Sequence, residues 1–443
     1  MESNYVSFYD ISIAVLWMVI FLLIANSRRK KVKDEEIKKY YLRNVLFKFF
    51  FAISFAIVYL VFYGGGDTTA YWDGAVTLNN LFLKSPSLYF EHLINEPSKE
   101  LFFDHFDIET GYPPGWIFKE PEAWFICKLA SIISFFTFKS YFAGTLVFAF
   151  LTAMASWRVF ELILKLNAHK KHIAALCILF VPTVSFWCTG VSKDSVVFIS
   201  ILNLIYYVFD IMVLRNPIKL RHILIIVISI FFIYHVRSFI LAAVIAPIFM
   251  SFGARLTKKY EKQFITKLLL RSAILFGGIF LFLQFFSSDF ASEMVAEAEL
   301  VQLDFTQNET YTGKRYEIVN TDASPAGLIR SVPESVFYGI YKPFIYESIS
   351  PTLIMNGIES LLLMFLTIRF FFAGNPLTKI RKLRKEEILV FAFIFSLFIA
   401  FMAGFTSVLF GVLVRIRAPL LPFFFLVLTV SMEKLNKNNN IIN

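Results

Sequence analysis

Apolar segments long enough to cross a membrane recur along the whole chain. A helix needs about 20 apolar residues to span roughly 30 Å of hydrocarbon, and shorter apolar helices occur in pairs that line cavities. The sequence predicts eleven such spans, at residues 7–25, 46–63, 140–162, 172–189, 194–214, 222–235, 238–253, 266–286, 352–373, 387–408 and 417–432.

The composition agrees with this pattern. Of the 443 residues, 57% are hydrophobic and only 17% are charged. Soluble domains are nearer a quarter charged and under half apolar, so a soluble enzyme, a disordered scaffold and a disulfide-stapled secreted module are excluded. We predict an all-α fold, a polytopic membrane helix bundle that forms a single integral membrane domain over residues 1–443.

The connecting segments alternate in charge. Lys and Arg cluster in every second one, at residues 28–43, 165–171, 215–221, 255–262, 379–385 and 434–437. The long segments 64–122 and 287–350 each carry ten Asp and Glu, but only three and four Lys and Arg. Because basic loops stay in the cytoplasm, we predict an outer N-terminus, an inner C-terminus and two outer loops with amphipathic helices, 64–139 and 287–350. The net charge of +10 is then topological, and nucleic acid is not an expected partner.

Two predicted outer turns each carry one cation. The turn at residues 189–194 places Lys193 just after Ser192, a candidate N-cap, where the helix N-terminus favours an anion such as phosphate. A Lys193 that reaches lipid headgroups is an equally good interpretation. Arg237 lies at the apex of a predicted hairpin between two short spans, which places it deep in the membrane. An arginine there is costly unless it faces a wet cavity or an anion, so functional burial is expected. The alternative is a headgroup-facing arginine in a thinned bilayer.

A third predicted outer turn carries two arginines. Arg415 and Arg417 are expected on an extended or irregular segment, where residues two apart can face the same way and clamp one phosphate group. The alternative is a pair of interfacial anchors.

The first outer loop opens with three glycines followed by Asp67. The glycines should release the chain sharply from the second span and place Asp67 at the membrane surface. There it could act as a general base or hold a metal ion, or it could cap the helix that follows. His92, His105 and His235 are too scattered in sequence to predict a histidine-ligated zinc site.

These residues together predict one carboxylate and four cations on one side of the membrane: Asp67, Lys193, Arg237, Arg415 and Arg417. A site that holds a lipid-linked phosphate or diphosphate and activates a hydroxyl needs such a set. The cations stabilise the departing phosphate, and the carboxylate takes the proton of the acceptor.

The first outer loop resembles that of the GT-C superfamily, polytopic glycosyltransferases that take sugars from polyprenyl phosphates. In that superfamily the loop begins with an Asp-centred motif and a Tyr, and a Pro-aromatic segment precedes the next span. Gly66-Asp67-Thr68-Thr69-Ala70-Tyr71 and Lys119-Glu120-Pro121-Glu122-Ala123-Trp124 are similar to those parts, which implies that Asp67 is the catalytic carboxylate. The chain departs from the pattern in having Thr68 in place of the usual Glu, an additional preceding span and an early Pro113-Pro114.

Three other segments, at residues 182–187, 190–194 and 415–422, resemble a family of bacterial exopolysaccharide membrane proteins. That family is similar in layout to O-antigen and oligosaccharide repeat-unit polymerases, whose outer arginines are thought to hold polyprenyl diphosphate. The two resemblances cover roughly residues 64–240 and 405–425. They imply glycan chemistry without specifying the sugar.

The leading hypothesis is a glycosyltransferase or repeat-unit polymerase of the bacterial inner membrane that uses polyprenyl-linked sugars at the outer face. Asp67 would be the acceptor base or the ligand of a divalent cation, and the four cations would bind the lipid phosphate. Aromatic side chains would line the sugar pocket: Tyr71, Trp72, Trp187 and His235. Other glycan-assembly proteins are possible partners.

Two alternatives remain open. A transporter or flippase for a lipid-linked glycan or organic anion would use the same cations along a path, and it predicts basic residues at mid-depth in several spans. A structural partner in an envelope complex would have mutually paired charges and no cavity.

Overall fold

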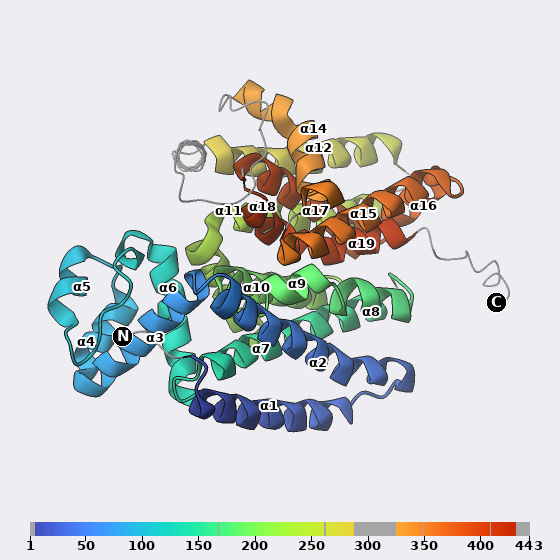
Figure 1. The fold of residues 1–443 in the computed structure, drawn as a ribbon. Coiled ribbons are helices and arrows are strands. Elements are labelled where there is room, and N and C mark those ends of the chain that lie inside the picture. The colour runs from blue at the N-terminus through green and yellow to red at the C-terminus, as the bar shows by residue number, and fades with distance from the viewer. Residues whose placement is uncertain are drawn as a thin grey trace. The chain divides into compact units, whose positions relative to one another are not determined.

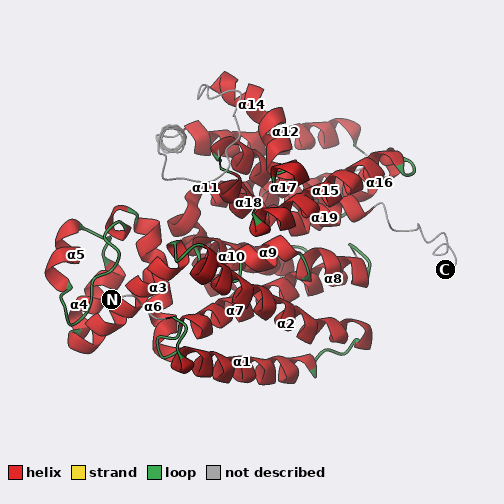
Figure 2. Cartoon of the chain, in the orientation of Figure 1, coloured by secondary structure: helices red, strands yellow, loops and turns green. Residues whose placement is uncertain are grey.

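The computed structural model describes residues 5–166, 168–260, 263–287, 325–348, 350–407 and 409–430. These residues form helices joined by turns and loops, without a β-strand (Figure 2). They divide into two compact units, unit 1 (Met1–Leu162 and Val184–Leu241) and unit 2 (Ile163–Thr183 and Ala242–Asn443). The predicted all-α class is confirmed. Most of the second predicted outer loop, 287–350, lies outside the described residues.

The helices of unit 1 comprise long apolar segments and a set of shorter helices between them (Figure 1). In chain order they are α1 (Phe8–Arg29), α2 (Glu35–Ile57), the π-helix η1 (Val58–Phe62), α3 (Asp67–Lys84), α4 (Pro86–Ile94), α5 (Lys99–His105), η2 (Ile117–Lys119), α6 (Pro121–Phe136), α7 (Tyr141–Lys165), α9 (Pro182–Trp187), α10 (Lys193–Met212) and the first part of α11 (Leu220–Lys259).

Unit 2 contains α8 and most of the helices that follow α11. They are α8 (Lys171–Leu179), α12 (Phe264–Ser287), α14 (Pro325–Tyr341), η3 (Ile345–Glu347), α15 (Pro351–Phe372), α16 (Pro376–Leu383), α17 (Glu387–Thr406), α18 (Phe410–Arg417), η4 (Ala418–Leu420) and α19 (Leu421–Thr429).

Eight helical segments within the described residues are long and apolar enough to cross a membrane, which supports a multi-pass membrane protein. They are Phe8–Arg29, Glu35–Phe62, Tyr141–Lys165, Lys193–Met212, Leu220–Gly253, Pro351–Phe372, Glu387–Thr406 and Phe410–Thr429. The exact number of spans and their orientation stay predictions.

One predicted span has a different form in the structure. The span expected at residues 172–189 is broken into α8 and α9, because Pro182 begins the second helix and disfavours helical geometry in the residue before it. The two spans expected at 222–235 and 238–253 are both helical, and the hairpin between them stays a prediction. They belong to two helices that meet inside α11 across a kink at Arg237, whose backbone angles are not helical, with φ −155° and ψ 81°.

In unit 1, α1, α2 and α7 pack together through side chains near their middles. Phe21 of α1 stacks on Phe150 of α7 with ring centroids 4.6 Å apart, and Asn44 of α2 donates to the Ala153 carbonyl of α7 at 2.8 Å. The shorter helices α3 to α6 gather beyond one end of these long helices (Figure 1). Gly74 of α3 allows the close contact with α6, because a Cβ there would lie 2.7 Å from the Cys127 Sγ.

In unit 2, α14 lies directly against α17 with their backbones in contact. A Cβ on Gly339 of α14 would lie 1.9 Å from the Ala400 carbonyl oxygen, and a Cβ on Gly404 of α17 would lie 1.9 Å from the Ser335 carbonyl oxygen. Small residues allow such close approach of membrane helices, where van der Waals contact replaces the hydrophobic effect as the driving force.

The Gly404→Ala substitution should destabilise the α14–α17 contact. Its methyl group meets backbone rather than a movable side chain, so we expect a loss of about 1–3 kcal/mol in the free energy of unfolding. Gly411→Ala is the matched control, because no atom lies within 4 Å of a Cβ at that position in α18. Thermal unfolding of both variants in detergent should lower the Tm for Gly404→Ala alone, and equal Tm values would contradict this packing.

Candidate functional site

Asp67 is the first residue of α3 and is half-buried. The three preceding glycines all have positive φ, at 64°, 120° and 135°, so the chain leaves η1 through a backbone path that other residues rarely adopt. Gly66 is the N-cap, and Thr69 Oγ1 accepts a hydrogen bond from its N–H at 3.0 Å. The interpretation of Asp67 as a cap is therefore wrong. Asp67 instead lies in the first turn, where the helix dipole stabilises its negative charge.

Lys193 lies at the N-terminus of α10, as predicted. Ser192 caps the helix, and its Oγ accepts from the Ser195 N–H at 3.2 Å. The Lys193 Nζ lies 3.1 Å from Glu120 Oε2, between side chains that are 15% and 48% exposed. Such a partly exposed ion pair contributes only about 0–1 kcal/mol, so Lys193 can exchange Glu120 for another anion at little cost.

Arg237 forms a second ion pair at the same helix N-terminus. Its Nη2 lies 2.6 Å from Asp194 Oδ1, and the two side chains are only 14% and 3% exposed. Breaking a pair this buried is costly, so Asp194 fixes the position of the guanidinium. A guanidinium has five N–H donors, and within the described residues the others of Arg237 have no protein hydrogen-bond partner.

Helix α6 lies near both α3 and the N-terminus of α10. Burial raises the pKa of the Cys127 thiol in α6, nearby Lys193 opposes this shift, and Asp73 of α3 adds to it. Both charges therefore lie near one side chain of α6. On the same helix, Phe125 stacks on His235 of α11, with ring centroids 5.5 Å apart and planes 17° apart.

The aromatic residues proposed for a sugar pocket have different environments. Tyr71 and Trp72 are 1% exposed and Trp187 is 4% exposed, so in this conformation they pack inside unit 1. Trp72 Nε1 also donates to the Lys139 carbonyl at 3.2 Å. His235 is exposed and is the member of this group that a ligand reaches directly.

Arg415 and Arg417 belong to unit 2 and lie on a helix. The expected extended segment is wrong, because α18 runs from Phe410 to Arg417 and continues into η4 and α19. Residues two apart on a helix are related by a rotation of about 200° about the helix axis, so their side chains lie on nearly opposite faces. This backbone therefore does not favour one phosphate held by both arginines. Arg415 is half-buried, whereas Arg417 is 0% exposed.

Arg417 is enclosed by oxygen acceptors. Its Nη1 donates to the carbonyls of Ile340, at 3.1 Å, and of Lys342, while its Nη2 donates to the Asn356 carbonyl at 3.3 Å and to Ser360 Oγ at 3.1 Å. These acceptors come from α14, α15 and the segment after α14. In this conformation the side chain holds those segments together and does not reach solvent.

Two further charges are buried inside spans, and the sequence analysis missed both. Lys48 of α2 is 0% exposed, and its Nζ donates to Ser185 Oγ at 2.6 Å. Glu359 of α15 is 6% exposed, and its Oε1 accepts from the Thr183 N–H at 2.9 Å. Within the described residues its other oxygen, Oε2, has no hydrogen-bond partner. The available signal was a charged residue well inside an apolar run, which marks a functional hypothesis in a membrane protein. Lys48 is the single charge in the span 46–63, and Glu359 lies in the span 352–373, whose other charge, Arg369, is near its end.

Sequence reasoning also undervalued two carboxylates beside the predicted cations. Asp194 and Glu120 are the direct partners of Arg237 and Lys193. Asp194 was adjacent to a predicted site residue, and Glu120 lies in the Pro-aromatic segment, but only the fold brings each one to its cation.

In the part of the chain that the structure describes, no three His, Cys, Asp or Glu side chains lie close enough together to hold a metal ion. A divalent cation at Asp67 therefore stays a prediction supported by Asp67 alone. His92 and His105 do meet, with Nε2 of the first and Nδ1 of the second 3.3 Å apart.

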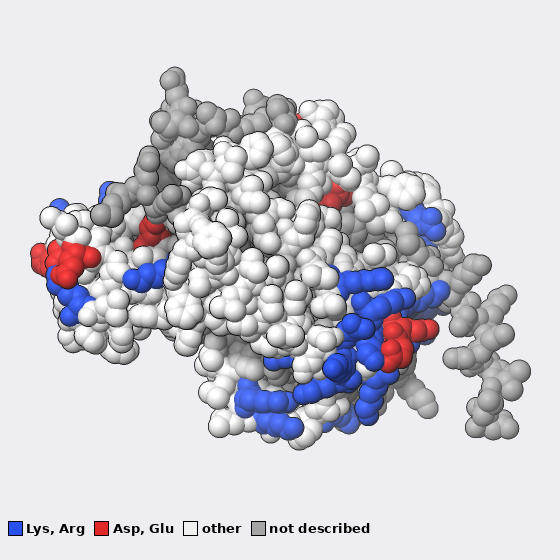
Figure 3. Space-filling view, turned by 60° about the horizontal axis from the view of Figure 1, so that its bottom comes forward, with Lys and Arg blue, Asp and Glu red and all other residues white. Residues whose placement is uncertain are grey.

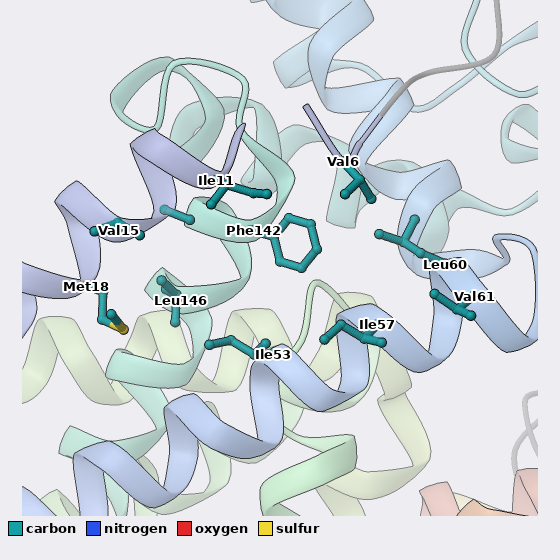
Figure 4. Close-up of a pocket in the computed structure, with 11 residues that line it drawn as sticks. Val6, Ile11, Val15, Met18, Ile53, Ile57, Leu60, Val61, Phe142 and Leu146 are labelled. Atoms are coloured by element: carbon teal, nitrogen blue, oxygen red, sulfur yellow. The ribbon is translucent and has the colours of Figure 1, made fainter. Parts of the chain in front are cut away.

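An apolar pocket of about 350 Å³ opens in unit 1 between α1, η1, α2 and α7 (Figure 4). Leu60 and Val61, in the segment that leads to Asp67, line it together with Val6 before α1. Ile53 and Met18 line its other end, as Figure 4 shows. Its lining suits a hydrocarbon chain and not a sugar or a phosphate.

Comparison with known proteins gives no match to a protein-family model, a curated protein or a solved structure. The functional argument therefore depends on the residues and geometry of this chain.

His92 of α4 has an unusual electrostatic setting outside the spans. Its ring packs against Phe106, with centroids 4.9 Å apart, and against Trp124, at 5.7 Å. Burial lowers the pKa of His92 from 6.5 to about 4, and the positive charges of His105 and Lys128 act in the same direction. The folded protein thus keeps this imidazole neutral at pH values where the unfolded chain protonates it.

The stability of the protein should fall as the pH drops from 6.5 towards 4. In this window the unfolded state binds a proton at His92 that the folded state does not, whereas above pH 6.5 the contribution is fully present. His92→Phe keeps an aromatic ring and removes the titration. Thermal unfolding at pH 7.5 and 5.0 should show a smaller loss of Tm in the variant than in the wild type. An equal loss would assign the pH dependence to other groups.

Proposed function

We propose that the protein is a glycosyltransferase or polysaccharide repeat-unit polymerase that uses polyprenyl-phosphate-linked sugars at the outer face of a bacterial inner membrane. The observation that carries this proposal is the pair of ion pairs at the N-terminus of α10, Lys193 with Glu120 and Arg237 with Asp194. Both cations pair with carboxylates at one anion-favouring helix end, and the two pairs differ in how far their side chains are exposed.

Arg237 and Lys193 would bind a lipid phosphate in different ways. Asp194 holds Arg237 in place, and the remaining N–H groups of the guanidinium are available for a phosphate oxygen. Lys193 would release the half-exposed Glu120 and turn to the same phosphate. The two cations would then stabilise the negative charge that develops on the leaving group. Such electrostatic stabilisation usually contributes most to the rate enhancement.

The carboxylates and the apolar pocket would supply the rest of the site. Asp67, half-buried at the start of α3, would take the proton of the acceptor hydroxyl, and Glu120 would be free to assist once Lys193 has left it. The apolar pocket beside Leu60 and Val61 supports the proposal by offering a place for the polyprenyl chain close to Asp67 in sequence.

A transporter or flippase for a lipid-linked glycan or an organic anion is the second candidate. It is favoured by the charges buried inside three separate spans, Lys48, Glu359 and Arg417. Charged groups inside membrane helices are costly and often mark a substrate or proton path. The cations at the N-terminus of α10 are paired with carboxylates, which is also the arrangement expected of a structural partner in an envelope complex.

Purified full-length protein in proteoliposomes, supplied with radiolabelled polyprenyl-diphosphate oligosaccharide, should elongate the glycan. Lys193→Ala should lower kcat/KM about 10–100-fold, which corresponds to the loss of one charged hydrogen bond. Asp67→Asn should lower kcat about 100-fold or more through loss of the general base. Lys99→Ala is the control, because it removes an exposed lysine of the same outer loop away from α10.

The same vesicles separate the competing functions. Movement of the lipid across the bilayer without elongation would support the transporter, and a Lys48→Met variant should then block movement. Neither elongation nor movement would leave the structural partner. A chelator in the elongation assay tests the predicted divalent cation at Asp67.

A further inference from the structure

A polar pocket of about 230 Å³ lies in unit 1 at the opposite end of the long helices from α3. Its charged lining comes from the last turn of α1 and the turn after it, Arg28 and Lys31, and from α7, Arg158 and Glu161. Helices distant in sequence thus bring three cations and one carboxylate to one hollow. None of these residues belongs to the site proposed above.

The cations of this pocket have only weak or neutral protein partners. Arg28 Nη1 lies 3.5 Å from the Met154 Sδ, a poor acceptor. Arg158 Nη1 donates to Asn203 Oδ1 at 2.6 Å, and its guanidinium lies 5.8 Å from the centroid of the Tyr207 ring. Among the residues described, Arg28, Lys31 and Arg158 form no ion pair with a carboxylate.

The wall of the pocket is rigid and aromatic. Tyr41 and Trp157 are 4% and 5% exposed and meet edge to face with centroids 4.6 Å apart. The Tyr41 hydroxyl donates to the Met154 Sδ at 3.1 Å. A fixed wall behind two guanidinium groups favours a planar, bidentate contact with an anion, which arginine makes better than lysine.

Phosphate is the anion that best fits this position. Arg28 to Arg43 form the first basic cluster, which the positive-inside rule assigns to the cytoplasmic face. Clusters of Lys and Arg also stand out on an otherwise largely uncharged surface (Figure 3). Phosphate groups of anionic lipids concentrate at that level, and basic pockets between membrane helices bind such headgroups.

We propose that this pocket binds a phosphate group, presented either by an anionic phospholipid headgroup or as free phosphate. Arg28 and Arg158 are the direct ligands, and Lys31 adds positive charge at the edge. Glu161 opposes the anion and keeps the binding reversible. The site is independent of the α10 cluster and of the function proposed for it.

The test compares variants of the full-length protein purified in detergent. Native mass spectrometry measures retention of phosphatidylglycerol against phosphatidylcholine, and a separate phosphorus NMR titration measures binding of inorganic phosphate. The double variant Arg28→Gln with Arg158→Gln should lower affinity for the bound probe at least about tenfold, since it removes two charged hydrogen-bond donors. Glu161→Gln should raise that affinity, because it removes the opposing charge.

Arg29→Gln is the control, because it removes the neighbouring cation of the same helix turn, which does not line the pocket. If the double variant retains less phosphatidylglycerol than the wild type, the phosphate group comes from the lipid headgroup. If the double variant loses only the binding of inorganic phosphate, the ligand is free phosphate. The proposal is overturned if neither probe responds to the double variant, or if Arg29→Gln has the same effect. If the double variant does not fold, Glu161→Gln decides, and unchanged or weaker binding overturns the proposal.

Discussion

The cost of placing charge in hydrocarbon constrains this protein more than any other interaction. Most of the chain is apolar, yet Lys48, Glu359 and Arg417 are buried inside segments long enough to span a membrane. Each is tolerated because hydroxyl or backbone groups surround it, and these contacts require particular neighbours. Arg417 holds α14, α15 and the segment between them through carbonyl oxygens, and Lys48 holds α2 against α9 through Ser185.

Charges near the helix ends follow a different rule. The Arg237–Asp194 pair is buried and fixes geometry, whereas the Lys193–Glu120 pair is half-exposed and can exchange. Arg28 and Arg158 have neutral partners and face a hollow. Arginine thus has a structural role inside unit 2 and a proposed ligand-binding role at the surface of unit 1. Burial and available partners decide between these roles.

The sequence anticipated the helices better than their interruptions. Long apolar runs predicted α1, α7, α10, α15 and α17 closely, and Ser192 was correctly identified as a cap. The failures concern backbone continuity. One span was expected where α8 and α9 are separate helices, and an irregular segment was expected where α18 forms. Local propensity does not distinguish a kink from a turn, because neighbouring helices supply the deciding contacts.

By itself, the sequence determined that the chain is helical and membrane-embedded, because only hydrocarbon burial accounts for so many apolar runs with so few charges. It also located the scarce cations at the predicted outer turns, among them Lys193 and Arg237. Only the tertiary structure decided the partner of each cation, since Glu120 meets Lys193 across 73 residues and Asp194 meets Arg237 across 43. Electrostatic interactions depend on distance and burial in space, and sequence spacing specifies neither across separate helices.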